Sequence, residues 1–289
     1  MAEIAGWSSA ILFGLSLVAG LMWQRYRFLD GGFLPVTFTL AVSAAMAENS
    51  SISWYRFYSY SPDWGIFIGH VPLHVVMIWP LFILGEVRYI REGLGLGSYK
   101  RHPHQGLQLQ AALQASFCFV DTALLANLIE VYCVSAGLWS WKQENCLGVP
   151  WIGALGWALF ATPAVIMVSL LEDVPWGWTW AGCLLLLPFL CLMVLHVGIL
   201  VIWNLGGGLR SAISPWQEAA GILLLQLLYH QATKGLKVSL HLSQELPRIL
   251  ACGIVAGLWL LKGRQGTDHA GVIMVSAASL ARMLAFEWR

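Results

Sequence analysis

The sequence predicts an all-α protein, a polytopic integral membrane helical bundle of about 7–9 transmembrane helices. Three observations predict this class. Hydrophobic residues make up 58% of the 289 residues and charged residues only 11%. The mean hydropathy is +0.69, well above that of a soluble domain. Long uncharged stretches recur, and the polar connections between them are short. We therefore expect a single integral membrane domain over residues 1–289.

Five stretches are long and apolar enough to cross about 30 Å of hydrocarbon. They are residues 4–23, 31–47, 65–85, 151–171 and 176–203. A sixth predicted span, residues 107–136, is apolar apart from Asp121 and Glu130. Weaker segments lie at 213–230, 249–261 and 270–286. The first span has neither a basic lead-in nor a small-residue cleavage site, so we expect a retained helix.

The distribution of basic residues predicts an orientation in the membrane. Among the connections between the six predicted spans, most of the basic residues lie in the first and third, namely Arg25, Arg27, Arg88, Arg91, Lys100 and Arg101. The positive-inside rule then places both connections in the cytoplasm and the N-terminus outside, and we expect a bacterial inner membrane. In either orientation the helix ends that carry Glu48, His70, His74 and Glu130 fall on one side of the bilayer.

Several function classes lack a signature. The 6 cysteines form no C-x-x-C pair, which indicates packing residues. The glycine runs at 93–98 and 206–209 do not connect a strand to a helix, so flexible turns are the simpler interpretation. Basic residues are few and scattered, which argues against nucleic acid as a partner. We expect membrane lipids as partners and no metal, nucleotide or redox cofactor.

Glu130 is the most informative residue, because it lies inside the apolar run "IEVYCVSAGLWSW". An ionised carboxylate deep in a membrane helix costs about 2.5–3.5 kcal/mol, so such groups usually face a cavity or a partner. Burial favours the neutral form of a carboxyl group, which can then act as a proton donor. The alternative is a structural acid, paired with Asn127 one turn earlier or with a histidine of the neighbouring span.

The other polar candidates are weaker. Asp121 lies nine residues before Glu130, on roughly the opposite helix face, so one straight helix cannot point both into one pocket. Glu48 closes the second predicted span, where an acid at the interface is cheap. His70 and His74 are four residues apart and are expected to share a face at the start of the third span. No third ligand matches their spacing, which favours hydrogen bonds to the acids over a metal site.

Aromatic residues gather after Glu130. Trp139 and Trp141 form a W-x-W pair nine residues on, with Trp157 further along. One interpretation is an interfacial tryptophan belt. The other is a set of ring faces that stabilise a carbocation by cation–π attraction and supply no nucleophile.

The stretch "IEVYCVSAGLWSW" followed by "LGVPWIGALGW" resembles the hallmark of the membrane carotenoid biosynthesis family that includes the gamma-carotene and bisanhydrobacterioruberin end-group hydratases. That family has a Glu-Pro nine residues before W-x-W, then G-V-P and N-x-x-G-W. The matching positions are Glu130, Trp139, Trp141, Gly148, Val149, Pro150, Gly156 and Trp157, with an upstream block of Glu48, Tyr58, Tyr60, Val71, Pro72 and Trp79. The resemblance covers about residues 40–160. Val131 replaces the family proline, and Gly153 replaces the asparagine.

The resemblance implies an apolar isoprenoid that enters from the lipid phase into a chamber formed by the second to fifth helices. Glu130 is the first candidate to protonate a terminal double bond, and Glu48 is the base that activates water with help from His70 or His74. The residues expected to contact the substrate are Asp121, Asn127, Tyr58, Tyr60, Trp79, Trp139, Trp141 and Trp157.

Two alternatives remain beside this hydratase. A membrane terpene or isoprenoid cyclase would share the protonation step but exclude water, and the missing asparagine and the many tryptophans favour it. A non-enzymatic isoprenoid or lipid carrier, or a transporter, would use Glu130 and Asp121 in a proton path. The acids cluster at one end and no repeat is visible, which argues against transport.

Overall fold

The computed structural model describes residues 32–97, 107–135, 137–142, 149–175, 177–205 and 215–234. These residues are mostly helical, which confirms the prediction of a helical chain. The helices are α2 (Phe33–Tyr55), α3 (Leu73–Arg88), α4 (Leu107–Ser135), α5 (Trp151–Leu171), α6 (Trp178–Leu205) and α7 (Pro215–Lys234). A π-helical turn, η2 (Tyr89–Gly93), extends α3. The predicted spans 4–23, 249–261 and 270–286 lie outside the described residues.

Four helical segments of the described part are long and apolar enough to cross a membrane. They are Leu73–Gly93, Leu109–Val134, Trp151–Leu171 and Trp178–Leu205. Helix α6 leaves large apolar side chains uncovered along its length, including Leu185, Phe189, Met193 and Val197. An exposed apolar face of this extent fits contact with lipid. These four segments indicate a membrane protein, while the count of about 7–9 spans stays a prediction.

The helix bounds agree with the sequence in part. Helix α5 covers the predicted 151–171, whereas α2 continues past residue 47 to Tyr55 and so contains Glu48. Helix α3 begins at Leu73, and the predicted start at residue 65 is wrong. Gly65 and Gly69 have positive φ, and Pro72 is extended, so the chain turns there before the helix can form.

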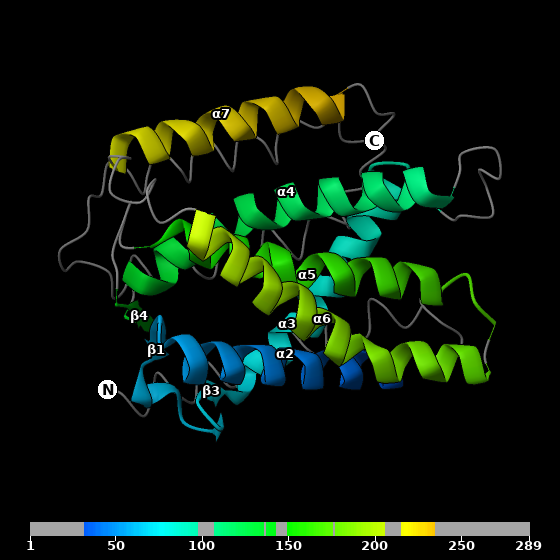
Figure 1. Cartoon of the computed structure of the whole chain (residues 1–289), viewed down its shortest axis with the longest axis horizontal. Coiled ribbons are helices and arrows are strands. Elements are labelled where there is room, and N and C mark those ends of the chain that lie inside the picture. The colour runs from blue at the N-terminus through cyan, green and yellow to red at the C-terminus, as the bar shows by residue number, and fades with distance from the viewer. Residues whose placement is uncertain are drawn as a thin grey trace.

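Two antiparallel strand pairs lie between the helices. β1 (Tyr58–Tyr60) pairs with β4 (Trp139–Trp141), and β2 (Phe67–Ile68) pairs with β3 (Val71–Pro72). The β1–β4 ribbon connects the chain after α2 to the chain after α4, and Figure 1 places it at one end of the bundle. Backbone bonds close it on both sides, from Lys142 N–H to Phe57 O (2.8 Å) and from Ser61 N–H to Leu138 O (2.9 Å).

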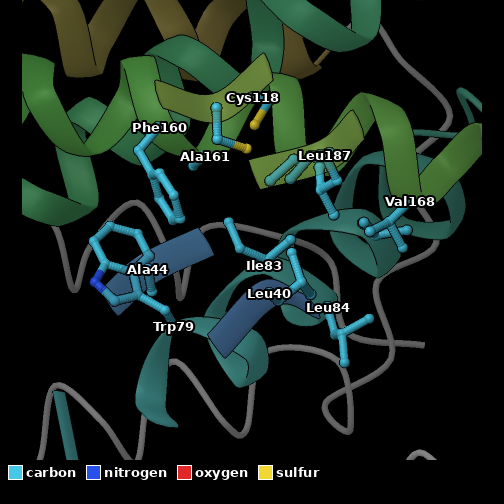
Figure 2. Close-up of a cluster of buried hydrophobic side chains, with 14 of the residues drawn as sticks. Leu40, Ala44, Trp79, Ile83, Leu84, Cys118, Phe160, Ala161, Val168 and Leu187 are labelled. Atoms are coloured by element: carbon cyan, nitrogen blue, oxygen red, sulfur yellow. The ribbon is translucent and has the colours of Figure 1, made fainter. Parts of the chain in front are cut away.

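Helix α5 is central to the packing. It contacts α3, α4 and α6, while α2 packs on α3 and α6, and α7 lies along α4 (Figure 1). Figure 2 shows the shared core, in which Trp79 and Ile83 of α3 meet Leu40 of α2, Phe160 of α5 and Leu187 of α6. This core holds the ends of α2 and α4, and therefore Glu48 and Glu130, in fixed positions.

Two of the basic residues on which the predicted orientation depends do not lie in a loop between spans. Arg88 belongs to α3 and is buried. Arg91 lies in η2, where its Nε is 2.9 Å from Glu172 Oε2 and its Nη1 donates to Ser169 O at 2.6 Å. Because Glu172 offsets the charge of Arg91, the orientation with the N-terminus outside depends on the remaining basic residues and stays a prediction.

The β2–β3 hairpin is clamped to α2 by Asn49. Its Nδ2 donates to Ile68 O at 3.0 Å, and its Oδ1 accepts from the backbone N–H of His70 at 2.7 Å. Gly69 lies between them with φ +66°, and a Cβ there would fall 2.2 Å from Asn49 Oδ1. Only glycine fits this turn, which holds the hairpin next to Glu48.

We predict that Gly69→Ala lowers the free energy of unfolding by about 1–3 kcal/mol, because it adds backbone strain and displaces the Asn49 amide. Thermal unfolding in detergent, followed by circular dichroism, measures this. The same change made in an Asn49→Ala background should cost less, because the clash is gone. Equal costs in both backgrounds would contradict the clamp. Gly85→Ala, where a Cβ meets nothing within 4 Å, is the control.

Candidate functional site

Glu130 lies near the end of α4 and is surrounded by tryptophans. Its side chain is 3% exposed. Trp139 Nε1 and Trp141 Nε1 donate to Oε2 at 2.7 and 3.0 Å, and Trp157 Nε1 donates to Oε1 at 2.9 Å. Side chains two apart in a strand point the same way, so β4 presents both of its indoles to the carboxylate. The W-x-W pair is therefore a buried hydrogen-bonding element and not an exposed belt.

Glu48 has a comparable environment on α2, where it is partly buried. The hydroxyl of Tyr58 donates to Oε2, as does that of Tyr60 at 3.1 Å. Trp79 Nε1 of α3 donates to Oε1 at 3.0 Å. The same alternation in β1 therefore presents two phenols to Glu48.

The β1–β4 register joins the two environments. It sets Tyr58 opposite Trp141 and Tyr60 opposite Trp139, with ring centroids 4.8 and 5.6 Å apart. We call the resulting set of rings the aromatic cage, which consists of Tyr58, Tyr60, Trp79, Trp139, Trp141 and Trp157. Trp79 and Trp157 close it from α3 and α5, with ring centroids 4.6 Å apart. Within it, Glu48 and Glu130 are close enough to interact electrostatically.

Gly153 makes room for one wall of the cage. A Cβ at this position would lie 2.7 Å from Cζ2 and 3.0 Å from Cη2 of Trp141. Any side chain on residue 153 would thus displace the indole that binds Glu130.

The two histidines do not share a helix face, which corrects the sequence-based expectation. His70 is exposed in the β2–β3 turn, before α3 begins, and its backbone N–H binds Asn49. His74 is in the first turn of α3, with its ring 3.8 Å from that of Trp64. The separation follows from the late start of α3. Within the described residues, no three His, Cys, Asp or Glu side chains form a group that could hold a metal ion.

Asp121 and Asn127 lie outside the cage. Asp121 is fully buried in α4, about 13 Å along the helix from Glu130 and on the opposite face. It lies close enough to Cys118 to act on it electrostatically, as does Glu86. Asn127 lines an apolar cavity of about 230 Å³ between α4, α5 and α7. Its other walls include Ala123, Trp151, Leu155, Gly221 and Leu225.

Three features that shape the site were not predicted from the sequence: the pairing of β1 with β4, the clamp of Asn49, and the space left by Gly153. The available signal was the double alternation, Y-x-Y after Glu48 and W-x-W after Glu130. A period of two is unexpected in a helical chain and is typical of strands.

Comparison of the chain with protein-family models, with curated proteins and with solved structures finds no match in any of the three.

We predict that Gly153→Ala displaces Trp141 and weakens its bond to Glu130, which should lower the free energy of unfolding by about 1–3 kcal/mol. Tryptophan fluorescence and thermal unfolding in detergent measure the two effects. Gly156→Ala is the matched control, since it lies one turn further on in α5 and a Cβ there meets nothing within 4 Å. If both variants behave alike, Gly153 does not support the cage.

Proposed function

We propose that this chain is a membrane isoprenoid-modifying enzyme that protonates a carbon–carbon double bond and directs the fate of the carbocation. The observation that carries the proposal is the pair of carboxylates, Glu48 and Glu130, in one aromatic cage at one end of an apolar helical bundle. No cofactor is required for this chemistry.

The composition of the cage fits such a reaction. A carbon–carbon double bond is a very weak base, so its protonation needs an acid in a site from which water is excluded. The cation that forms needs negative charge and ring faces near it, but no strong nucleophile. Indole N–H and phenol O–H groups donate in or near the plane of the ring, so the hydrogen bonds to the acids do not use the ring faces. The cage therefore combines a proton source, an anion and a cation-stabilising wall.

Capture of the cation by water makes the enzyme a hydratase, as the resemblance to the carotenoid family implies. In that case water attacks the tertiary cation and loses a proton to one of the carboxylates. Cyclisation is the second candidate, in which an internal double bond attacks instead. The contact of Gly153 with Trp141 favours it, because an indole occupies the space where a polar side chain could hold water.

The apolar cavity supports an elongated apolar substrate. Asn127, which lines it, lies one turn before Glu130 on α4. Three helices supply its otherwise apolar walls. We place the isoprenoid tail there, with the reacting double bond at the cage and access from the lipid between α4 and α7.

The product assay tests the reaction. We predict that the chain, expressed in a bacterium that makes linear carotenoids or shorter polyprenyl compounds, yields a product heavier by one water or an isomer of unchanged mass. Mass spectrometry with chromatography separates the two, the first meaning hydration and the second cyclisation. Glu130→Gln and Glu48→Gln should each lower the yield by about 10²–10⁴-fold. Protein that is folded but forms no product from any of these compounds would contradict the proposal and favour transport.

The cavity gives a separate prediction. Gly221→Leu should fill it, because a Cβ at Gly221 meets nothing within 4 Å and the position lines the cavity. We expect product formation to fall at least tenfold for long substrates with thermal stability retained. Gly182→Leu in α6, which is equally open, is the control for the gain in helix propensity. Unchanged turnover in Gly221→Leu would contradict the placement of the isoprenoid tail in this cavity.

A further inference from the structure

The two carboxylates of the cage differ in the chemistry of their partners. Among the described residues, the hydrogen-bond donors to Glu130 are three indole N–H groups. Those to Glu48 are two phenol hydroxyls and one indole. An indole N–H can only donate a hydrogen bond, whereas a phenol hydroxyl can donate and accept.

The partners of Glu130 suit an ionised carboxylate. Trp139 and Trp141 both donate to Oε2, and Trp157 donates to Oε1. A proton on either oxygen would weaken at least one of these bonds, since no indole can turn round and accept it. Charge-assisted bonds of this kind are also stronger than bonds to a neutral group. Protonation of Glu130 would therefore weaken its hydrogen bonds to the three indoles.

The partners of Glu48 suit both protonation states. Tyr58 and Tyr60 both donate to Oε2, and their rings make an edge contact with centroids 5.7 Å apart. A proton on Oε2 can be donated to one phenol oxygen, whose own hydrogen then turns away from the carboxyl group. Only hydroxyl hydrogens move, and the heavy atoms stay in place.

The two acids also differ in exposure, and the charge of each acts on the other. As whole residues, Glu48 is partly exposed and Glu130 is 3% exposed. The charge of each carboxylate disfavours ionisation of the other, so the pair tends to hold one proton between its two members. Desolvation, with the charge of Glu48 next, raises the pKa of Tyr58 and Tyr60 well above its usual value. Both phenols therefore keep their protons. Cys133 is a further titratable group beside Glu130.

We propose that the pair holds a single proton, that this proton resides on Glu48 and is the one given to the substrate, and that Glu130 stays ionised as the counter-charge of the cation. This reverses the roles expected from the sequence, where Glu130 came first as the acid. The step to the substrate rests on the proposed function, whereas the location of the proton does not.

The reaction balances without another reactant. The double bond uses its π electrons to form a C–H bond with the proton of Glu48, which leaves a tertiary cation and a Glu48 carboxylate. In hydration, a lone pair of water forms a C–O bond, and the proton that water loses returns to Glu48. In cyclisation, a second double bond forms the C–C bond, and loss of a C–H proton to Glu48 restores a double bond. Each route ends with Glu48 protonated again.

Infrared difference spectroscopy of the whole chain in detergent at neutral pH tests where the proton is, without any substrate. Subtracting the Glu48→Gln spectrum from that of the unaltered protein should reveal a protonated carboxyl band. The Glu130→Gln subtraction should reveal carboxylate bands. The opposite pattern, with the protonated band belonging to Glu130, would overturn the proposal, and so would carboxylate bands from both residues.

Phenylalanine variants supply a second measurement that keeps the shape of the site. Tyr58→Phe and Tyr60→Phe should shift the frequency of the Glu48 carboxyl band and lower the rate of product formation by roughly 10- to 100-fold. Tyr55→Phe is the matched control, because the Tyr55 hydroxyl bonds to His196 and not to either acid. An unshifted band in both cage variants would exclude the role of the phenols. If the proton is on Glu48 but no isoprenoid is converted, the proposed function fails and the proton assignment stands.

Discussion

The fold at this end of the bundle depends on satisfying one carboxylate. A charge on Glu130 inside an apolar helix costs about 2.5–3.5 kcal/mol on the lenient insertion scale. A hydrogen bond to a charged group contributes about 1.5–3 kcal/mol, so the three indole N–H groups are enough to offset that cost. They come from β4 and α5, which are separated from Glu130 along the chain. Satisfying the acid therefore fixes the return of the chain after α4 and the position of α5.

This requirement also explains why a helical membrane protein contains a strand pair. Residues two apart do not face the same way on a helix, but they do on a strand. Two donors for one carboxylate, at positions 139 and 141, therefore need an extended backbone, and so do the phenols at 58 and 60. A ribbon this short is marginal by itself. It is held because the side chains of both cross-strand pairs, Tyr58 with Trp141 and Tyr60 with Trp139, donate hydrogen bonds to an acid.

The sequence predicts the part of this structure that depends on local composition. The uncharged run from Trp151 to Leu171 gives α5 its bounds, and nine-residue spacing places Asp121 on the far face of α4 from Glu130. The start of α3 could not be predicted in this way, because the left-handed turns at Gly65 and Gly69 interrupt a run that is apolar enough for a helix. The role of Gly153 was hidden for another reason. The ring of Trp141 lies where a side chain on residue 153 would be, and this contact exists only in the folded chain.

An anion beside a carbocation poses a chemical problem, since a carboxylate can trap the cation as an ester. The hydrogen bonds to Glu130 address it. They occupy lone pairs on both oxygens and lower the electron density available for attack, while the negative charge still acts through space. Glu48, whose phenol partners can turn away, is less protected in its ionised form, but it is ionised only between giving up its proton and recovering one. The difference between indole and phenol partners thus separates two tasks that two identical acids could not divide: one stabilises charge throughout, and the other moves the proton.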